Sequence, residues 1–286
     1  MNGSLGRDRV WNDHIWSEID KAVREEVGRV RVAQKVFPST VVNNVLPVSA
    51  NRVFPYKDYS TFTRPVYVGP WPGDDEFRPL FEISRRFVLT RAQVDGEENV
   101  HLAPSLARLA ASAIASAEDT ILFLGKSNLV DITNKSALPP GFVAEASNFP
   151  TVPKAASKIL TAVAEGIAEL NKDAQPGPYA LFVSPKRYAE TFKPPSGQLL
   201  TPGDQVNHIV TGGFYVVNSL ADPAYSDIGI LVSLGGEPVK IILGTEAMTA
   251  FTHIDDKSNY HFRVFERIQL VVRDGRAFQK LALKEG

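Results

Sequence analysis

The sequence predicts an α+β fold, in which helices are interspersed with mostly antiparallel strands. Two observations support this prediction. Apolar residues recur at helical spacing in three separate segments, and short apolar runs bounded by turn residues follow one another in the last third of the chain. Of the 286 residues, 44% are hydrophobic and 22% are charged, which is typical of a globular chain with a solid core.

The first helix is predicted after a polar lead of residues 1–12. Asn12 or Asp13 is suited to cap it, because a short polar side chain accepts a hydrogen bond from the first unpaired N–H groups. Apolar side chains recur at helical spacing along one face. They are Ile15, Ile19, Val23, Val27 and Val30, with Trp16 beside them.

From Pro47 to Pro79 the chain is rich in proline and aromatic residues and has little helical period. Proline at this density excludes a helix and weakens a central strand. The aromatic side chains are costly to leave in water, so this arm must either fold back on its own domain or lie across another subunit. The residues alone leave both arrangements open. The aromatic residues that matter most are Phe54, Tyr56, Phe62, Tyr67 and Trp71.

Residues 81–90 alternate as a strand does, and a long helix is predicted from Leu102 to Ile121, with Gly125 just past its end. Small residues fill its middle, which favours close packing against another backbone. Residues 126–150 are loop-like, and Thr151 is predicted to cap a second helix. The apolar face of this second helix consists of Ile159, Val163, Ile167 and Leu170.

The last third of the chain predicts strands near residues 179–184, 214–218, 228–234, 238–243 and 262–272. Residues 193–204 are rich in proline, glycine and polar groups, which indicates an exposed loop. Gly235-Gly236 is predicted to form a tight hairpin turn between two of the strands.

The composition excludes several classes of function. There are 0 cysteines, which excludes disulfides, thiolate metal sites and cysteine nucleophiles. The formal net charge is −1 and no basic stripe is visible, so nucleic-acid binding is not indicated. No apolar run approaches the roughly 18 residues of a membrane span, and no signal peptide is evident, so we expect a cytoplasmic protein.

No catalytic or cofactor-binding motif is recognisable, and no catalytic residue or metal site is predicted. The best metal-like group is His253, Asp255, Asp256 and His261. Its spacing matches no helical pair of ligands, which favours a solvated turn between strands.

Acidic residues around the long helix are also assigned structural roles. Glu97, Glu98 and His101 precede the helix, which indicates capping and a favourable interaction with its dipole. Glu118 and Asp119 are adjacent in sequence, so they point to different faces and cannot form an acid–base pair by themselves.

Three motifs, in matching order and spacing, carry a specific resemblance. Residues 16–20 (WSEID) followed by 35–37 (KVF) resemble the first helix of family 1 encapsulin shell proteins, the linocin or bacteriocin-type family. Residues 117–125 (AEDTILFLG) resemble the family's E-D-x-x-I-F-x-G element, and residues 177–188 resemble its G-P-Y element. The likeness extends from residue 13 to about residue 283.

The resemblance implies the tailed-phage major capsid fold of the Hong Kong phage 97 type, with a peripheral domain, an axial domain and an extended loop. The division it implies is residues 1–47 for the N-terminal helix and arm, 48–80 for the extended loop, 81–125 and 226–286 for the peripheral domain with its spine helix, and 126–225 for the axial domain.

The implied function is that of a structural shell protein that has no chemistry of its own. It would assemble into an icosahedral nanocompartment of on the order of 60 subunits or a multiple. The aromatic arm would bury its apolar surface on a neighbouring subunit. The shell would enclose a cargo enzyme, such as a ferritin-like protein or a dye-decolourising peroxidase, for iron storage or oxidative-stress defence. Neither a membrane nor a nucleic-acid partner is expected.

The resemblance also implies two sets of site residues. A short targeting peptide on the cargo would dock on Arg31, Val32, Lys35, Val36 and Phe37, with Phe251 and Asp255 as further candidates. For Val36 and Phe37, ordinary core packing is an equally good interpretation. The loop at the five-fold opening would contain Pro195, Ser196, Gly197, Pro202, Gly203 and Asp204, too few charges for strong ion selectivity.

Two departures from the family pattern stand out. Some members hold a flavin against a tryptophan, but the matching position here is Ala92, so we predict no cofactor. Residues 3–6 (GSLG) resemble the core of encapsulin cargo peptides, although a flexible leader accounts for them more simply.

Two alternatives remain open at this point. A phage or prophage capsid subunit would share the fold and package DNA, and a locally basic inner face would be enough for that. An enzyme is disfavoured because no nucleophile–base pair is recognisable.

Overall fold

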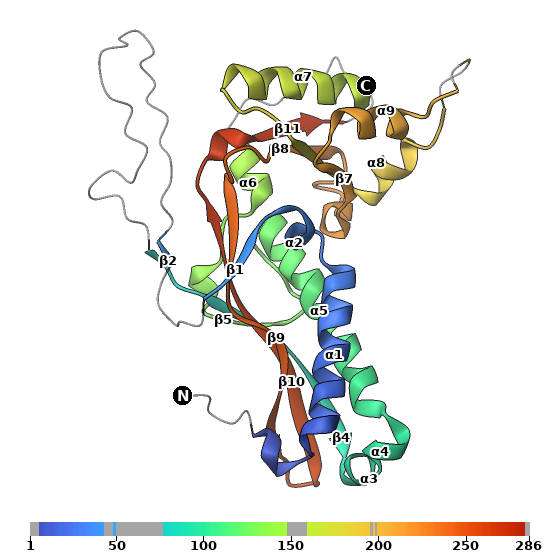
Figure 1. Cartoon of the computed structure of the whole chain (residues 1–286), viewed down its shortest axis with the longest axis vertical. Helices are drawn as coiled ribbons and strands as arrows, with labels where there is room; N and C mark the ends of the chain where they lie inside the picture. Colours follow the sequence, from blue (N-terminus) through green and yellow to red (C-terminus); the bar gives the residue numbers. More distant parts are fainter. Residues whose placement is uncertain are drawn as a thin grey trace.

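The computed structural model describes residues 6–42, 48–49, 77–147, 159–194, 197 and 199–283. The molecule is elongated and contains two main sheets, one in each half, which we call the lower sheet and the upper sheet as they stand in Figure 1. A helical layer lies beside the lower sheet, and further helices flank the upper sheet. The fold is therefore α+β, as predicted.

The described helices are η1 (Arg7–Arg9), α1 (Asp13–Val30), α2 (Ala33–Val36), α3 (Arg91–Asp95), α4 (Glu97–Val100), α5 (Leu102–Leu124), η2 (Lys135–Ala137), α6 (Phe142–Ser147), α7 (Ile159–Lys172), α8 (Pro185–Glu190), α9 (Pro202–Ile209), η3 (Asn218–Ala221) and η4 (Gly275–Ala277). The described strands are β1 (Ser39–Val41), β2 (Val48–Ser49), β3 (Phe77–Arg78), β4 (Phe81–Thr90), β5 (Asp131–Thr133), β6 (Tyr179–Val183), β7 (Gly213–Val216), β8 (Ile228–Ser233), β9 (Val239–Ile254), β10 (Asn259–Val272) and β11 (Phe278–Ala282).

The lower sheet has the strand order β1-β9-β10-β4-β5. Its centre is the long antiparallel hairpin of β9 and β10, and β1 runs parallel to β9. Helices α1 and α5 pack against each other and against this sheet, so one core lies between the helical layer and the strands (Figure 1).

Helix α1 confirms the first predicted helix and its cap. The Oδ1 atom of Asn12 accepts a hydrogen bond from the backbone N–H of Ile15 at 3.1 Å. The predicted apolar face is buried, and only Val30 at the end of the helix is partly exposed. The indole of Trp11 stacks on Phe262 with 5.0 Å between ring centroids, which fixes the approach of the chain to α1.

Helix α5 confirms the predicted spine helix. It begins with the expected cap, because the Oε1 atom of Glu97 accepts a hydrogen bond from the backbone N–H of Ala103 at 2.8 Å. It ends at Gly125, which has a φ of 71°. The following loop returns to this end so closely that a Cβ at Gly141 would lie 2.5 Å from the backbone N of Gly125. Only glycine fits at these two positions.

The upper sheet has the strand order β11-β8-β6-β7, and its side chains divide between two cores. Phe182, Ile230 and Phe278 face the core that is shared with the lower half. Leu181 and Leu231 are the sequence neighbours of Phe182 and Ile230, and they face a second core under α7 and α9. This period of two is what a strand buried on both faces requires, and it explains the continuous apolar run in β6.

The predicted hairpin at Gly235-Gly236 is wrong. β8 pairs with β6 and β11 in the upper sheet, whereas β9 pairs with β1 and β10 in the lower sheet. The two glycines therefore carry the chain from one sheet to the other. A glycine pair indicates a change of direction, but it does not specify which strand the next one joins.

The topology also differs from the division into domains that the resemblance implies. β8 and β11 belong to the upper sheet together with β6 and β7, although residues 226–286 were assigned to the peripheral domain. The lower half takes only β9 and β10 from that range. Shared sheet hydrogen bonds make β8 and β11 part of the upper unit.

Other predictions are refined. Residues 126–147 contain β5 and α6 rather than loop alone, while β9 and β10 are longer than the sequence indicates. Strand β11 was not predicted. Helix α7 is described from Ile159, and the expected cap at Thr151 lies outside the described residues.

Candidate interaction surfaces

The short helix α2 is held in place by Asp119 of α5. The two carboxylate oxygens of Asp119 accept hydrogen bonds from the backbone N–H groups of Val32 at 2.8 Å and Ala33 at 3.0 Å. Asp119 thus caps a helix that lies 86 residues away in sequence. Burial raises the pKa of Asp119 to about 7, and the neighbouring Glu118 raises it as well.

Beside this cap lies a buried cluster of one arginine and two glutamates. Arg31, at the end of α1, lies 2.6 Å from Glu118 of α5 and 2.6 Å from Glu266 of β10, and both carboxyl side chains have 0% exposure. Gln34 donates a hydrogen bond to Glu118 at 2.7 Å and accepts one from Arg31 at 3.0 Å. The cluster joins α1, α2, α5 and β10 at one point.

Two carboxyls share a single cation in this dry site. Burial raises the pKa of Glu118. Burial also raises the pKa of Glu266 to about 8, and the nearby charge of Glu118 raises it further. Because Arg31 supplies only one positive charge, one of the two carboxyls keeps its proton at neutral pH.

The structure separates the residues predicted to bind a peptide near α2 into two kinds. Phe37 is 2% exposed and packs against Phe142 with 5.0 Å between ring centroids, so it belongs to the core. Arg31 is 8% exposed and engaged in the buried cluster. Both side chains are therefore buried in the chain, and their predicted contact with a peptide stays a prediction. Val32 and Val36 are half-buried and pack partly against the core, and Lys35 is exposed, so the accessible parts of these three side chains form the surface of α2.

Phe251 and Asp255 lie elsewhere. Phe251 is half-buried on β9, where its ring contacts those of Tyr260 and Phe262. Asp255 closes the turn between β9 and β10 by accepting hydrogen bonds from the backbone N–H of Lys257 at 2.9 Å and of Asn259 at 2.8 Å. The side chain of Asn259 also donates a hydrogen bond to Asp255 at 3.0 Å, and this bond, with the backbone N–H of Asn259, holds the pKa of Asp255 well below its usual range.

The turn at Asp255 confirms the interpretation of the histidine–acid group as a turn between strands. His253 and His261 face each other across the hairpin with 4.4 Å between their ring centroids. The Nε2 atom of His261 lies 3.1 Å from Asp255. Within the residues that the structure describes, no group of three or more histidine and acidic side chains is placed to hold a metal ion.

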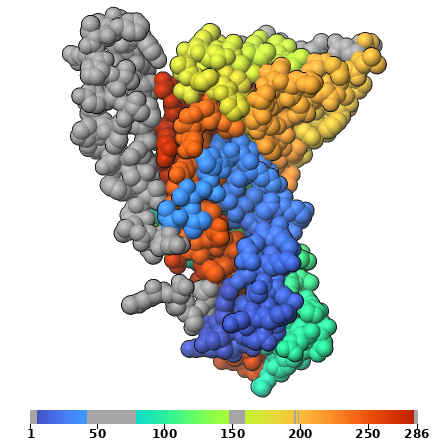
Figure 2. Space-filling model, viewed as in Figure 1, coloured from blue at the N-terminus to red at the C-terminus, as the bar shows by residue number. Residues whose placement is uncertain are grey.

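The two candidate docking regions lie at opposite ends of α1. The α2 surface follows its C-terminal end (Figure 1). Phe251 lies beside Gly6, which comes shortly before its N-terminal end in sequence. An 18-residue helix is about 27 Å long. An extended peptide of about eight residues would be needed to span both regions. Figure 2 shows α1 and α2, in blue, on the visible face of the molecule.

The predicted pore-loop residues belong partly to a helix. Pro202, Gly203 and Asp204 form the first turn of α9, so an exposed loop is wrong for these three. Thr201 and Asp204 make a reciprocal capping box at the start of α9, and hydrogen bonds from Thr201 lower the pKa of Asp204. Gly197 has a φ of 79° and is exposed, while Pro195 and Ser196 lie outside the described residues.

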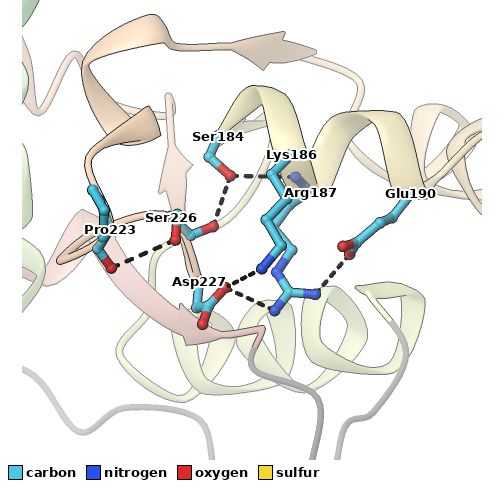
Figure 3. A network of polar contacts seen from close by, with 7 residues as sticks. All are labelled: Ser184, Lys186, Arg187, Glu190, Pro223, Ser226 and Asp227. Atoms are coloured by element: carbon cyan, nitrogen blue, oxygen red, sulfur yellow. Dashed lines mark hydrogen bonds and ion pairs between the residues drawn. The ribbon is translucent and has the colours of Figure 1, made fainter.

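Helix α8 comes just before the predicted pore loop in the chain, and the polar network of Figure 3 holds it in place. Arg187 of α8 donates hydrogen bonds to Glu190 at 2.6 Å and to Asp227 at 2.8 Å. Ser184 caps α8 through the backbone N–H of Arg187 at 3.3 Å and donates a hydrogen bond to the carbonyl of Ser226 at 2.7 Å. Helix α8 is therefore anchored to the turn that precedes β8.

The predicted contact of the aromatic arm with another subunit rests on five residues. Phe54, Tyr56, Phe62, Tyr67 and Trp71 lie outside the described residues. Their predicted contact with a neighbouring subunit stays a prediction.

Comparison with known proteins identifies the family. The model of a family described as "Encapsulating protein for peroxidase" matches residues 11–269 of this chain. The chain belongs to this encapsulin family. Its members are shell proteins and not enzymes, which confirms the prediction of a structural role.

A curated relative agrees with the family match. The type 1 encapsulin shell protein EncA of Myxococcus xanthus is 23% identical over 206 residues. The aligned part covers 69% of this chain and 66% of that protein, slightly less than two thirds of its length.

Solved structures confirm the predicted fold. A virus-like particle from Pyrococcus furiosus matches with a TM-score of 0.69 and 14% identity, over 93% of this chain and 98% of the other. The SrpI encapsulin of Synechococcus elongatus matches with a TM-score of 0.60 and 12% identity, over 90% and 89%. The capsid of an empty GTA particle matches with a TM-score of 0.57 and 14% identity, over 87% and 88%. This encapsulin has the tailed-phage major capsid fold of the Hong Kong phage 97 type.

In the described part of the chain, no helix is long and apolar enough to cross a membrane.

The sequence did not reveal Arg7, Asp20 and Glu266 as positioning residues. Asp20 lies within the WSEID motif, but its ion pair with Arg7 was not foreseen, and Arg7 and Glu266 each contact side chains or carbonyls more than 200 positions away.

Proposed function

We propose that this encapsulin assembles with copies of itself into an icosahedral compartment that encloses a cargo enzyme in the cytoplasm. The family match over residues 11–269 carries the proposal, because it includes both halves of the capsid fold. The family is described by its encapsulation of a peroxidase, which favours an oxidative-stress enzyme as cargo; a ferritin-like iron-storage cargo is the alternative. Closed symmetry lets modest contacts between subunits accumulate into a stable shell.

The direct test is to express the chain alone and examine it by size-exclusion chromatography and electron microscopy. Hollow, closed particles of uniform size support the proposal, with on the order of 60 subunits or a multiple. A monomer at working concentration would contradict it. The 260/280 nm absorbance ratio of purified particles separates this function from a DNA-packaging capsid, which would carry nucleic acid.

For assembly, we propose that residues 48–80 form the extended loop and bury their aromatic side chains on a neighbouring subunit. Phe62→Asp or Trp71→Asp is expected to leave a folded subunit that does not assemble, because a charge replaces an apolar contact. Circular dichroism checks folding and electron microscopy checks assembly. Intact shells from both variants would count against this role.

For cargo, we propose that a targeting peptide docks on the α2 surface, with Val32 and Val36 as apolar anchors and Lys35 as the charged neighbour. The support is geometric, since Asp119 holds the start of α2 rigidly while these three side chains remain accessible. A rigid, partly apolar ledge suits recognition of a short peptide.

The test of docking compares Val36→Asp with Arg24→Asp, a control at an exposed position in the middle of α1. Val36→Asp is expected to lower the amount of co-purified cargo at least about tenfold by removing one apolar anchor, while shells still form. Cargo is measured by quantitative gel analysis of intact particles. Equal loading of both variants would remove α2 from the docking site.

A further inference from the structure

The segment from Arg31 to Val36, which we call the latch segment, lies between α1 and β1. It contains the four-residue helix α2, whose N-cap residue, Val32, makes no capping hydrogen bond with its side chain. Asp119 of α5 supplies the cap instead, by accepting hydrogen bonds from the backbone N–H groups of Val32 and Ala33. A helix this short is not stable alone, so its position depends on contacts with other elements.

Polar contacts hold the latch segment on α5 and β10. The guanidinium of Arg31 lies 2.6 Å from Glu118 of α5 and 2.6 Å from Glu266 of β10. Gln34 donates a hydrogen bond to Glu118 at 2.7 Å and accepts one from Arg31 at 3.0 Å. The two glutamates have 0% exposure and belong to long elements of the core. The short latch segment is therefore the part of this cluster that can move most easily.

The charges around Arg31 do not balance when every acid is ionised. Three carboxyls face it, those of Glu118 and Asp119 on α5 and of Glu266 on β10, whereas α2 contributes the uncharged Gln34. Burial, together with the charge of Glu118, raises the pKa of Glu266 to about 8 and that of Asp119 to about 7. Loss of these protons leaves three negative charges around one cation in a buried site.

We propose that this cluster is a proton-dependent latch. While one glutamate carries a proton, Arg31 pairs with the other, and the latch segment stays closed on α5 and β10. When that proton is lost, the segment moves away and admits water to both carboxylates. Phe37, which is 2% exposed and packs against Phe142, stays in place and confines the opening to the residues before it. The latch is a property of the single subunit and does not depend on the proposed function.

The direction and size of the effect follow from the linkage between protonation and opening. The ordinary pKa of Glu266 is 4.5, and water that enters the open segment returns this carboxyl towards that value. Between these two pKa values the closed state holds a proton that the open state releases, so the latch opens as the pH rises. The opening equilibrium constant rises by up to about tenfold per pH unit, and it levels off above about pH 9, where both states have lost the proton.

Hydrogen–deuterium exchange with mass spectrometry measures this opening on the full chain. Peptides that cover residues 31–37 report it, because the backbone N–H groups of Val32, Ala33 and Phe37 are hydrogen-bonded in the closed state. After correction for the intrinsic exchange rate, their protection factor is expected to fall about fivefold to tenfold between pH 7 and pH 8. Residues 107–115, in the middle of α5, are the internal control and should keep their protection factor.

Two variants assign the effect to the stored proton. Glu266→Gln keeps the shape of the protonated glutamate but has no proton to lose. Protection of residues 31–37 should then change by at most about twofold from pH 7 to pH 8, the part that remains from Asp119. Glu82→Gln is the matched control, because Glu82 lies in the same sheet and pairs with Arg263 and Arg267. It should show the full fall.

A protection factor of residues 31–37 that does not change with pH in the unaltered chain would overturn the proposal. The same conclusion would follow from a fall that residues 107–115 share, since the whole core would then be opening, or from a fall that persists unchanged in Glu266→Gln. The comparison of the two peptides needs no variant, so it decides the matter even if Glu266→Gln does not fold. Failure to form closed particles would count against the proposed function alone, because the exchange measurement needs only the folded subunit.

Discussion

One arginine bridges two carboxylates in both halves of the molecule, and the two clusters behave in opposite ways. Arg187 in the upper half holds Glu190 and Asp227, whose side chains are 34% and 31% exposed. Arg31 in the lower half holds Glu118 and Glu266, whose side chains are 0% exposed. The distances within the two clusters are similar, between 2.6 and 2.8 Å.

The pKa shifts differ in sign because the surroundings differ. For Asp227, burial raises the pKa, but the hydrogen bonds and charges of Arg187 and Lys186 together outweigh it, so its pKa is lowered. For Glu266, burial dominates and the pKa rises to about 8. The comparison teaches that the surroundings, and not the number of charged partners, determine whether such a cluster carries a permanent charge or stores a proton.

The largest expected effect is loss of the lower arginine. Arg31→Ala leaves two glutamates without a cation in a dry site and is expected to lower the free energy of unfolding by about 3–5 kcal/mol. Urea denaturation measures this change. Equal losses of stability in Arg31→Ala and Arg187→Ala would contradict the conclusion that burial makes the two clusters differ.

The pH dependence of stability tests the stored proton. In the folded state Glu266 keeps its proton up to about pH 8, whereas its ordinary pKa is 4.5. The contribution of Glu266 to stability is therefore greatest below its ordinary pKa and is lost as the pH rises towards 8, by on the order of a few kcal/mol. Thermal unfolding between pH 6 and 9 should show this fall, and Glu266→Gln should reduce it to the part contributed by Asp119, whose pKa is raised to about 7.

A matched control for this profile is Glu82→Gln. Glu82 lies in the same sheet and pairs with two arginines, Arg263 and Arg267, but its side chain is 11% exposed. The variant is expected to keep the fall in stability towards alkaline pH. An equally flat profile in both variants would mean that the proton is not stored at Glu266.

The smallest expected effect is in the upper cluster. Arg187→Ala is expected to cost about 1–2 kcal/mol, because water reaches the carboxylates that it leaves behind. The lowered pKa of Asp227 means that its contribution is present above its ordinary pKa and is lost as the pH falls through the lowered one. In urea denaturation at pH 7 and pH 3, Asp227→Asn should lose at most about 1 kcal/mol of this acid dependence. A larger loss would make the upper cluster resemble the lower one.

Local patterns were sufficient to predict several elements. Asn12 capped a helix and Gly125 ended one, because each depends on its own backbone conformation and on neighbours within one turn. The resemblance carried by the E-D motif was also specific. What the motif does was not visible: Asp119 caps α2 and Glu118 holds Arg31, both across more than 80 residues.

The candidate docking site was only partly predictable for a related reason. Phe37 and Val36 are adjacent apolar residues at the end of the same short helix, and the sequence leaves open which one is buried. The packing of Phe37 against Phe142 and Phe182, both from later in the chain, decides it. The ion pair of Arg7 with Asp20 was missed because Arg7 also donates to the carbonyl of Thr249, which is 242 positions away in sequence.

The sequence by itself determined the α+β class, the main helices and most strands, the family, and the absence of cysteine chemistry, since these depend on periodicity, local capping and motif order. Only the tertiary structure decided which sheet β8 and β11 join, which side chains remain accessible on α2, and which carboxyls hold a proton. Those outcomes depend on burial by residues that are distant in the chain, and burial is a property of the packed fold.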